Sequence, residues 1–234
     1  MTAHVCQYLI NKPFCDTEYI QKYNITNIKI LKDKRMKKNL LKLISITLLL
    51  FSVVALLPSC SQRIYYVELN VKDMGRIVLE LDAKSAPKTV KHFVDLVEEG
   101  FYDGLTFNRA QPGFVIQGGD GGQASKNRNV VGEFHANGYK NPISHIRGVI
   151  SMARGGEYDS ASTQFFICHQ DARSSLDGLY AGFGYVVEGM EVVDMIVEKT
   201  SPYGNPNNMY FIYDTTKQAV IESARVLEEY TPAN

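Results

Sequence analysis

Tryptophan and cysteine are scarce in this 234-residue sequence, which has no tryptophan and four cysteines. Cys6 and Cys15 lie near the N-terminus and Cys60 ends an apolar run, so Cys168 is the single thiol of the chain that follows. One cysteine can form neither an intrachain disulfide nor a cysteine-based metal site. Because Cys168 itself lies in an apolar run, we expect a buried side chain rather than a nucleophile.

A net charge is also missing, since 25 basic residues balance 25 acidic ones. The balance is uneven along the chain: nine Lys and Arg and three acidic residues precede Cys60, and a net charge of −6 follows it. Nucleic-acid binding requires clustered Lys and Arg, so the sequence predicts no nucleic-acid partner. The histidines lack metal-ligand spacing, and we expect no metal and no cofactor.

The sequence lacks a run of the ~20 apolar residues that a membrane-spanning helix needs. Residues 43–57 form an apolar stretch of 15 residues that follows Lys37 and Lys38, a pattern typical of a signal peptide. The stretch ends in Leu57-Pro58-Ser59-Cys60, which resembles the lipobox of bacterial lipoproteins, where cleavage exposes a cysteine for acylation. We therefore expect residues 36–59 to be a lipoprotein signal peptide and Cys60 to carry lipid. An uncleaved membrane anchor is the alternative.

The segment before this signal, residues 1–35, fits no targeting pattern. A signal peptide begins near the start of its protein, and Met36 heads one of ordinary proportions. Residues 1–35 are therefore predicted to be an upstream extension or to reflect a misassigned start. Either a signal or an anchor at residues 36–59 predicts that the rest of the chain lies outside the cytoplasm, in a bacterial cell envelope.

After a short tether at 60–65, residues 66–230 have the pattern of one domain. Val67, Leu69 and Val71 alternate with polar residues, as do Ile77, Leu79 and Leu81 after a turn at 73–75, which predicts an antiparallel hairpin. A helix is expected next, with Ser85 as its cap, Pro87 in its first turn and Gly100 at its end. Apolar residues at helical spacing give this helix one face that must pack against the strands.

Many short β-type segments separated by Gly, Pro and Asn follow the helix. A second helix is predicted from helical spacing at 188–199, and residues 200–217 are loop-like with an apolar trio at 210–212 that is expected to pack locally. This pattern is typical of a mainly β, mostly antiparallel barrel capped by two α-helices. The β-type segments are 105–110, 114–118, 130–134, 149–153, 163–168, 183–187 and 219–227.

Four ordered blocks of this domain resemble the cyclophilins. The first is Phe101–Asp120 (FYDGLTFNRAQPGFVIQGGD), the second is RGVISMAR at 147–154, the third is STQFFIC at 162–168, and the fourth is LDG at 176–178 with Phe183-Gly184. Together with the hairpin and the first helix, the resemblance covers residues 66 to about 228. It implies a closed eight-stranded antiparallel β-barrel capped by two α-helices and a peptidyl-prolyl cis-trans isomerase that assists protein folding.

The resemblance also implies an active site that works without a covalent intermediate. Arg109 matches the catalytic arginine, which hydrogen-bonds the twisted prolyl nitrogen, and Gln117 matches the residue that orients it. The catalytic set is therefore Arg109, Gln117 and Phe114, and the substrate-binding set is Val115, Ala153, Arg154, Gln164, Phe166, Leu176 and Tyr180. The sequence departs from the family where Asn108 and Tyr180 stand at frequent histidine positions and Ser175 at a frequent tryptophan position.

The expected partners are proline-containing unfolded or exported polypeptides and a membrane, reached through the lipid on Cys60, with the domain itself monomeric. Two other functions fit the same pattern. A binding module could hold proline-containing peptides without turning them over, and an envelope protein could use the barrel as a spacer. Arg109 separates the isomerase from the binding module, because the pocket walls would serve both, and an unoccupied pocket in a peptide screen would favour the spacer.

Overall fold

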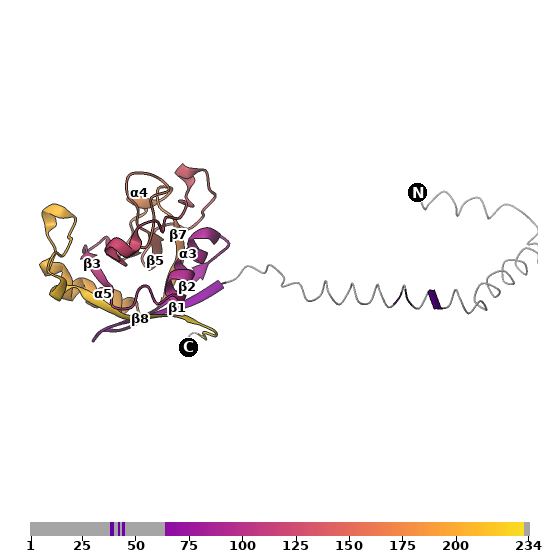
Figure 1. The fold of residues 1–234 in the computed structure, drawn as a ribbon. Helices are drawn as coiled ribbons and strands as arrows, with labels where there is room; N and C mark the ends of the chain where they lie inside the picture. Colours follow the sequence, from indigo (N-terminus) through magenta and orange to yellow (C-terminus); the bar gives the residue numbers. More distant parts are fainter. Residues whose placement is uncertain (1–37, 40–41, 43, 45–63, 232–234) are drawn as a thin grey trace, which may run out of the picture. The chain divides into compact units, whose positions relative to one another are not determined.

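The computed structural model describes residues 38–39, 42, 44 and 64–231, and Figure 1 shows the fold. The chain divides into two units, Met1–Ser61 and Gln62–Asn234. Among the described residues, no helix is both long and apolar enough to cross a membrane. The predictions for Cys60, for residues 1–35 and for most of residues 36–59 lie outside the described residues.

The domain begins with the predicted hairpin of β1 (Ile64–Val71) and β2 (Gly75–Asp82). The strands pair antiparallel from Ile64 opposite Asp82 to Val71 opposite Gly75. The turn needs left-handed backbone at Asp73 (φ 59°) and at Gly75 (φ 120°), which glycine adopts without strain. Alternate side chains such as Val67 and Leu79 are fully buried, as expected for strands with one face in a core.

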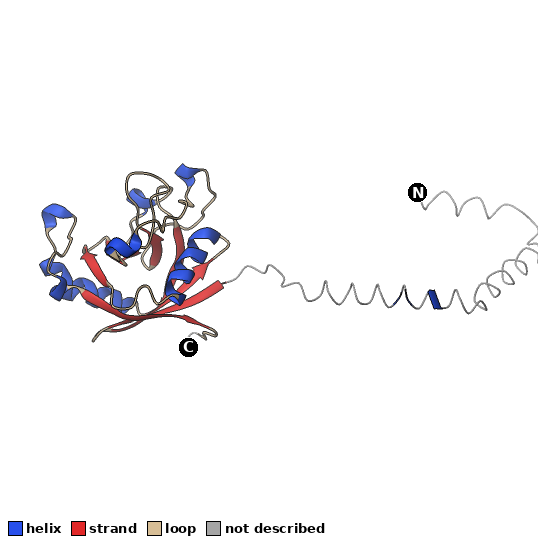
Figure 2. Cartoon of the chain, in the orientation of Figure 1, coloured by secondary structure: helices blue, strands red, loops and turns tan. Residues whose placement is uncertain are grey.

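Eight strands close into a barrel in the order β1-β2-β7-β5-β6-β4-β3-β8. Figure 2 shows the strands in red and the helices in blue. All neighbouring strands are antiparallel, which confirms the predicted closed eight-stranded antiparallel barrel. The remaining strands are β3 (Thr106–Ala110), β4 (Val115–Gly118), β5 (Val149–Met152), β6 (Phe165–Cys168), β7 (Gly182–Glu188) and β8 (Ala219–Leu227).

The two predicted helices are α3 (Pro87–Glu98) and α5 (Met190–Thr200). Their buried faces join the core that fills the barrel, where Phe93 of α3 packs edge-on against Phe165 of β6 at 5.5 Å between ring centroids. Aromatic pairs in this geometry stabilise a core beyond the area that they bury. The short elements are α4 (Arg173–Leu176) and the 3₁₀ helices η1 (Gly122–Ser125), η2 (His135–Asn137), η3 (Ser201–Tyr203), η4 (Pro206–Asn208) and η5 (Thr215–Lys217).

Two sequence predictions about the start of α3 and its surroundings are wrong. Ser85 does not cap the helix, because its hydroxyl donates to Asp82 at 2.5 Å and Ala86 stands at the cap position. Residues 130–134 form no strand, only a bridge between Val130 and Ala161. Their Glu133 carboxylate instead accepts hydrogen bonds from Lys88 N (3.2 Å) and Thr89 N (2.8 Å), so a distant loop caps the helix.

Candidate active site

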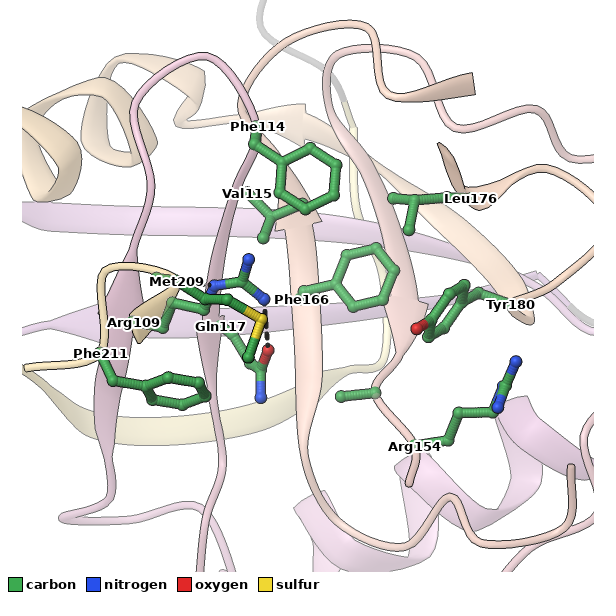
Figure 3. A pocket seen from close by; sticks show the side chains of 11 residues that line it. Arg109, Phe114, Val115, Gln117, Arg154, Phe166, Leu176, Tyr180, Met209 and Phe211 are labelled. Carbon is green, nitrogen blue, oxygen red and sulfur yellow. Dashed lines mark hydrogen bonds between the residues drawn. The ribbon is translucent and has the colours of Figure 1, made fainter. Parts of the chain in front are cut away.

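One pocket of about 270 Å³ lies on the barrel where β3, β4 and β6 run side by side (Figure 3). Two further segments complete it: α4 with the chain that follows, and the 201–217 loop between α5 and β8. The lining residues are Arg109, Phe114, Val115, Gln117, Ala153, Arg154, Phe166, Leu176, Tyr180, Met209 and Phe211. The structure therefore brings together every residue predicted for the site except Gln164, which contacts the pocket through Gln117.

Arg109 is positioned by strand β3, where it pairs with Gln117 on β4. Its Nη1 donates to Gln117 Oε1 (3.4 Å), its Nη2 to Gln111 Oε1 (2.5 Å) and its Nε to the Met209 carbonyl (2.7 Å). None of these acceptors is charged, and no ion pair to Arg109 occurs among the described residues. The positive charge of the guanidinium is therefore not neutralised within the site.

Two aromatic rings flank this guanidinium. Its carbon lies 5.5 Å from the centroid of Phe114 and 5.8 Å from that of Phe211, distances at which a ring face attracts a cation. Burial lowers the pKa of Arg109 from its ordinary value, and the nearby Tyr180 acts in the opposite direction. Arginine nevertheless stays protonated at any physiological pH, so the pocket holds a permanent hydrogen-bond donor.

Gln117 links Arg109 to a second amide. Its oxygen accepts from Arg109, and its Nε2 donates to Gln164 Oε1 at 2.9 Å. Gln117 is almost buried, at 9% exposed, and a buried side chain with both ends bonded has little freedom to rotate. These two bonds limit the rotation of the guanidinium and tie Gln164 to the site. The role of Gln117 in orienting Arg109 during catalysis stays a prediction.

The apolar wall of the pocket consists of Phe114, Val115, Phe166 and Leu176, with Tyr180 edge-on to Phe166 at 5.7 Å. Behind Phe166 stacks the buried ring of His145, at 5.9 Å. His145 lies within hydrogen-bond distance of Asp177 Oδ1 (2.9 Å) and Ser151 Oγ (3.0 Å). Burial lowers the pKa of His145, and a neutral ring bonded at both nitrogens supports the wall from behind.

Sequence reasoning missed Met209 and Phe211. Of the apolar trio 210–212, only Ile212 is buried, at 2% exposed, while the Phe211 ring lines the pocket. Met209 and Tyr210 both have left-handed backbone (φ 50° and 59°), a conformation that is costly for non-glycine residues. The adjacent Met209 carbonyl bonds Arg109. Apolar residues in a polar loop were the only sequence signal for this contact.

Cys168 and the four histidines of the described domain do not form a second reactive centre. The Cys168 thiol is fully buried, and burial raises its pKa to about 12, so almost no thiolate forms near neutral pH. This confirms the predicted buried role. Within the described part of the chain, no three His, Cys, Asp or Glu side chains cluster in a way that could hold a metal ion.

Comparisons with known proteins agree on one family. A family model described as cyclophilin type peptidyl-prolyl cis-trans isomerase/CLD matches residues 66–226. Peptidyl-prolyl cis-trans isomerase A of Dickeya dadantii is 36% identical over 196 residues, which cover 80% of this chain and 98% of that protein. Peptidyl-prolyl cis-trans isomerase B of Bacillus subtilis is 41% identical over 122 residues, which cover 52% of this chain and 82% of that protein.

The fold has solved counterparts. A crystal structure of a cyclophilin type peptidyl-prolyl cis-trans isomerase from Cryptosporidium parvum matches with a TM-score of 0.59 and 24% identity, covering 72% of this chain and 100% of that one. A second structure of that protein, obtained in the presence of the dipeptide Ala-Pro, matches with a TM-score of 0.57. At this level of identity, the likeness shows the fold.

Proposed function

Because the chain belongs to the cyclophilin-type peptidyl-prolyl cis-trans isomerase family, we propose that its pocket holds a prolyl residue while Arg109 assists rotation about the preceding peptide bond. The chain is a peptidyl-prolyl cis-trans isomerase. The proposal concerns how the site performs this reaction and where the protein works. The observation that carries it is a permanently charged guanidinium, without a carboxylate partner, beside an apolar pocket.

The reaction needs no nucleophile and no acid or base. Rotation about an X-Pro bond breaks amide resonance against a barrier of ~18–20 kcal/mol, and it takes tens to hundreds of seconds when uncatalysed. In the twisted state the prolyl nitrogen becomes pyramidal and gains a lone pair that accepts a hydrogen bond. A donor fixed beside that nitrogen stabilises the twisted state more than the planar one, which is the condition for catalysis.

Arg109 has hydrogen-bond donors to spare for this role. A guanidinium carries five N–H donors, and the bonds to Met209, Gln117 and Gln111 use three of them within the described chain. Two N–H groups are therefore left for a substrate. The three existing bonds hold the guanidinium in one orientation, so little reorganisation is needed when the peptide bond twists.

The apolar wall supports the other part of the proposal, namely that the pocket holds a prolyl residue. A pyrrolidine ring is compact and apolar, and Phe114, Val115, Phe166 and Leu176 offer it a pocket of matching character. The Cryptosporidium parvum relative, whose structure was determined in the presence of Ala-Pro, supports a prolyl ligand for the fold. Holding the ring still while the preceding residue rotates confines the motion to the bond that must turn.

The reaction itself is tested with the full chain purified in detergent and an alanine-based peptide containing one proline. We expect the cis-to-trans relaxation rate of the peptide to rise in proportion to protein concentration. For a peptide bound in the pocket, a barrier lowered by ~7 kcal/mol corresponds to rotation about 10⁵-fold faster than in free solution. Exchange NMR or a protease-coupled absorbance assay measures the rate. A relaxation rate that stays at the uncatalysed value at every protein concentration would contradict the proposal.

We also propose that the protein is exported, that lipid on Cys60 attaches it to a membrane, and that it assists slow prolyl isomerisation in exported chains. The charged and apolar run before Cys60 and the Leu57-Pro58-Ser59-Cys60 sequence support this. Uncatalysed prolyl isomerisation takes 10–100 s, slow enough to limit folding. Confinement at the surface where exported chains emerge would raise the local concentration of the isomerase there.

Replacing Cys60 by serine tests the anchor in a bacterial host. We expect the wild-type protein to incorporate labelled fatty acid, to gain the corresponding mass at a new N-terminal Cys60, and to sediment with membranes. The Cys60→Ser variant should incorporate no label. A Cys60→Ser protein that remains in the membrane fraction, with a wild-type protein that also carries no lipid, would identify residues 36–59 as an uncleaved anchor instead.

A further inference from the structure

Arg154 is the second arginine of the pocket, and it lies at the end away from Arg109. In Figure 3 its side chain is next to Tyr180, whereas Arg109, Met209 and Phe211 lie on the other side of Phe166. It follows Ala153 just after strand β5. Therefore, in a peptide whose proline contacts the apolar wall, only the residues on one side of that proline, either before it or after it, would pass Arg154.

The Arg154 side chain is held by many contacts. Its Nε donates to the Leu179 carbonyl at 3.0 Å, and its Nη1 donates to the carbonyls of Gly155 (2.9 Å) and Gly156 (3.3 Å). Three rings surround its guanidinium carbon, at 5.2 Å for Phe134, 5.3 Å for Tyr158 and 4.8 Å for Tyr180. Within the described chain, Nη2 donates no hydrogen bond. The group is fixed in place, with donors left for a ligand.

The charge of Arg154 also lacks a partner. Five of the seven described arginines pair with Asp or Glu at 3.0 Å or less, and the two that do not are Arg109 and Arg154, the two that line the pocket. Carboxylates are not scarce, since 22 acidic residues follow Cys60. The paired arginines are Arg76, Arg128, Arg147, Arg173 and Arg225.

A structural role alone explains only part of this arrangement. The bonds from Nε and Nη1 tie the 155–156 backbone to the chain near Leu179, and this accounts for two of the three guanidinium nitrogens. It does not account for a guanidinium at the pocket edge with a free nitrogen and no counter-charge. A fixed guanidinium with open donors matches a carboxylate in both charge and geometry.

We propose that Arg154 binds an acidic side chain of the substrate, so that the enzyme prefers proline-containing peptides with Asp or Glu on the flank that passes Ala153 and Arg154. This inference rests on the proposed binding of proline in the pocket. Arg109 provides the donor for the rotating bond, and Arg154 selects the sequence around it. The side chain of Arg154 is thus a specificity-determining group for peptides.

The test is a set of alanine-based peptides with a central proline, each carrying Glu, Gln or Lys at one of four positions: the two before the proline and the two after it. The full chain in detergent is assayed at low salt. We expect the Glu peptide to exceed the matched Gln peptide in kcat/KM by about five- to tenfold on one flank only, as for a charge-assisted hydrogen bond. The ratio should shrink as salt screens the charges.

Variants at position 154 separate this role from a structural one. Arg154→Gln should bring the Glu-to-Gln ratio close to one, Arg154→Lys should keep part of it, and Arg154→Glu should reverse the preference in favour of a Lys peptide. Arg128→Gln, which removes a guanidinium paired with Glu99 outside the pocket lining, is the matched control and should keep the wild-type ratio. Loss of folding would lower the rates for all peptides together and would not reverse a preference.

Two results would overturn the inference: a wild-type ratio near one at all four positions, or a ratio that survives in Arg154→Gln. Failure of the proposed function has a different signature, namely no acceleration of any peptide, including the neutral ones. In that event, peptide affinities measured by fluorescence anisotropy with the same Glu and Gln pairs still decide whether Arg154 binds the acidic side chain.

Discussion

Replacing Arg109 by alanine is expected to lower kcat/KM for X-Pro isomerisation by about 10²- to 10³-fold, the usual effect of removing one donor that acts on the transition state. The loss should fall mainly on kcat, because in the proposed mechanism the guanidinium bonds the prolyl nitrogen only when the peptide bond is twisted. The apolar wall remains in the variant, so the affinity for the same peptide should fall by less than about tenfold. Isomerisation kinetics and calorimetric titration of one peptide measure the two quantities.

The interpretation of this variant depends on two controls. Arg76→Ala removes an arginine that pairs with Glu68 and Glu188 outside the pocket lining, and it should leave kcat/KM at the wild-type value. Arg109→Lys keeps the charge but loses the planar group that reaches Met209, Gln111 and Gln117 together, so we expect it to recover only part of the activity. Wild-type turnover by Arg109→Ala would rule out the proposed mechanism.

The second large effect is expected from Glu133→Ala, which should lower the free energy of unfolding by about 3 kcal/mol. Glu133 is only 2% exposed and caps α3 from a distant loop, accepting from the backbone of Lys88 and Thr89 and from the Thr89 hydroxyl. Alanine would leave backbone N–H groups at a helix start without a partner, and each buried unpaired group costs ~1–3 kcal/mol. Urea unfolding monitored by circular dichroism measures the change.

Conservative and surface replacements show whether capping is the cause. Glu133→Gln keeps an oxygen that can accept one of these bonds but loses the charge that the helix N-terminus favours, so we expect about half of the loss. Glu198→Ala removes an exposed carboxylate from α5 and should change the free energy of unfolding by less than about 0.5 kcal/mol. If Glu133→Ala unfolds at the wild-type urea midpoint, the cap contributes nothing.

The elements that were predicted correctly are those with local patterns. Alternation in 66–82 defines the hairpin, and helical spacing from Val90 to Val97 defines the buried face of α3. Ser85 shows where such reasoning fails. Its position favours a helix cap, yet its hydroxyl donates to Asp82 instead. Glu133, about 45 residues away in the chain, accepts the hydrogen bonds of the backbone at the helix N-terminus. A contact between distant segments leaves no pattern near either residue.

The candidate site shows the same difference between residues with a recognisable sequence pattern and residues that are brought in by distant segments. The residues predicted for the site, which lie in or between the parts of the ordered family blocks, gather in one pocket or contact it, although the role assigned to each stays a prediction. Met209 and Phe211 lie outside those blocks, in a loop whose apolar residues were expected to pack locally rather than to line the site. They contact Arg109 from a segment in which two consecutive residues, Met209 and Tyr210, have left-handed backbone. No single-sequence rule predicts such a pair for Met and Tyr.

The closed ring of strands has a consequence for the proposed work on unfolded chains. Open sheets present unpaired N–H and C=O groups along their outermost strands, and an extended polypeptide can add there and remain. In the described barrel every strand has a neighbour on both sides, since β8 pairs with both β1 and β3. An isomerase built this way can work among aggregation-prone chains without becoming a template for them.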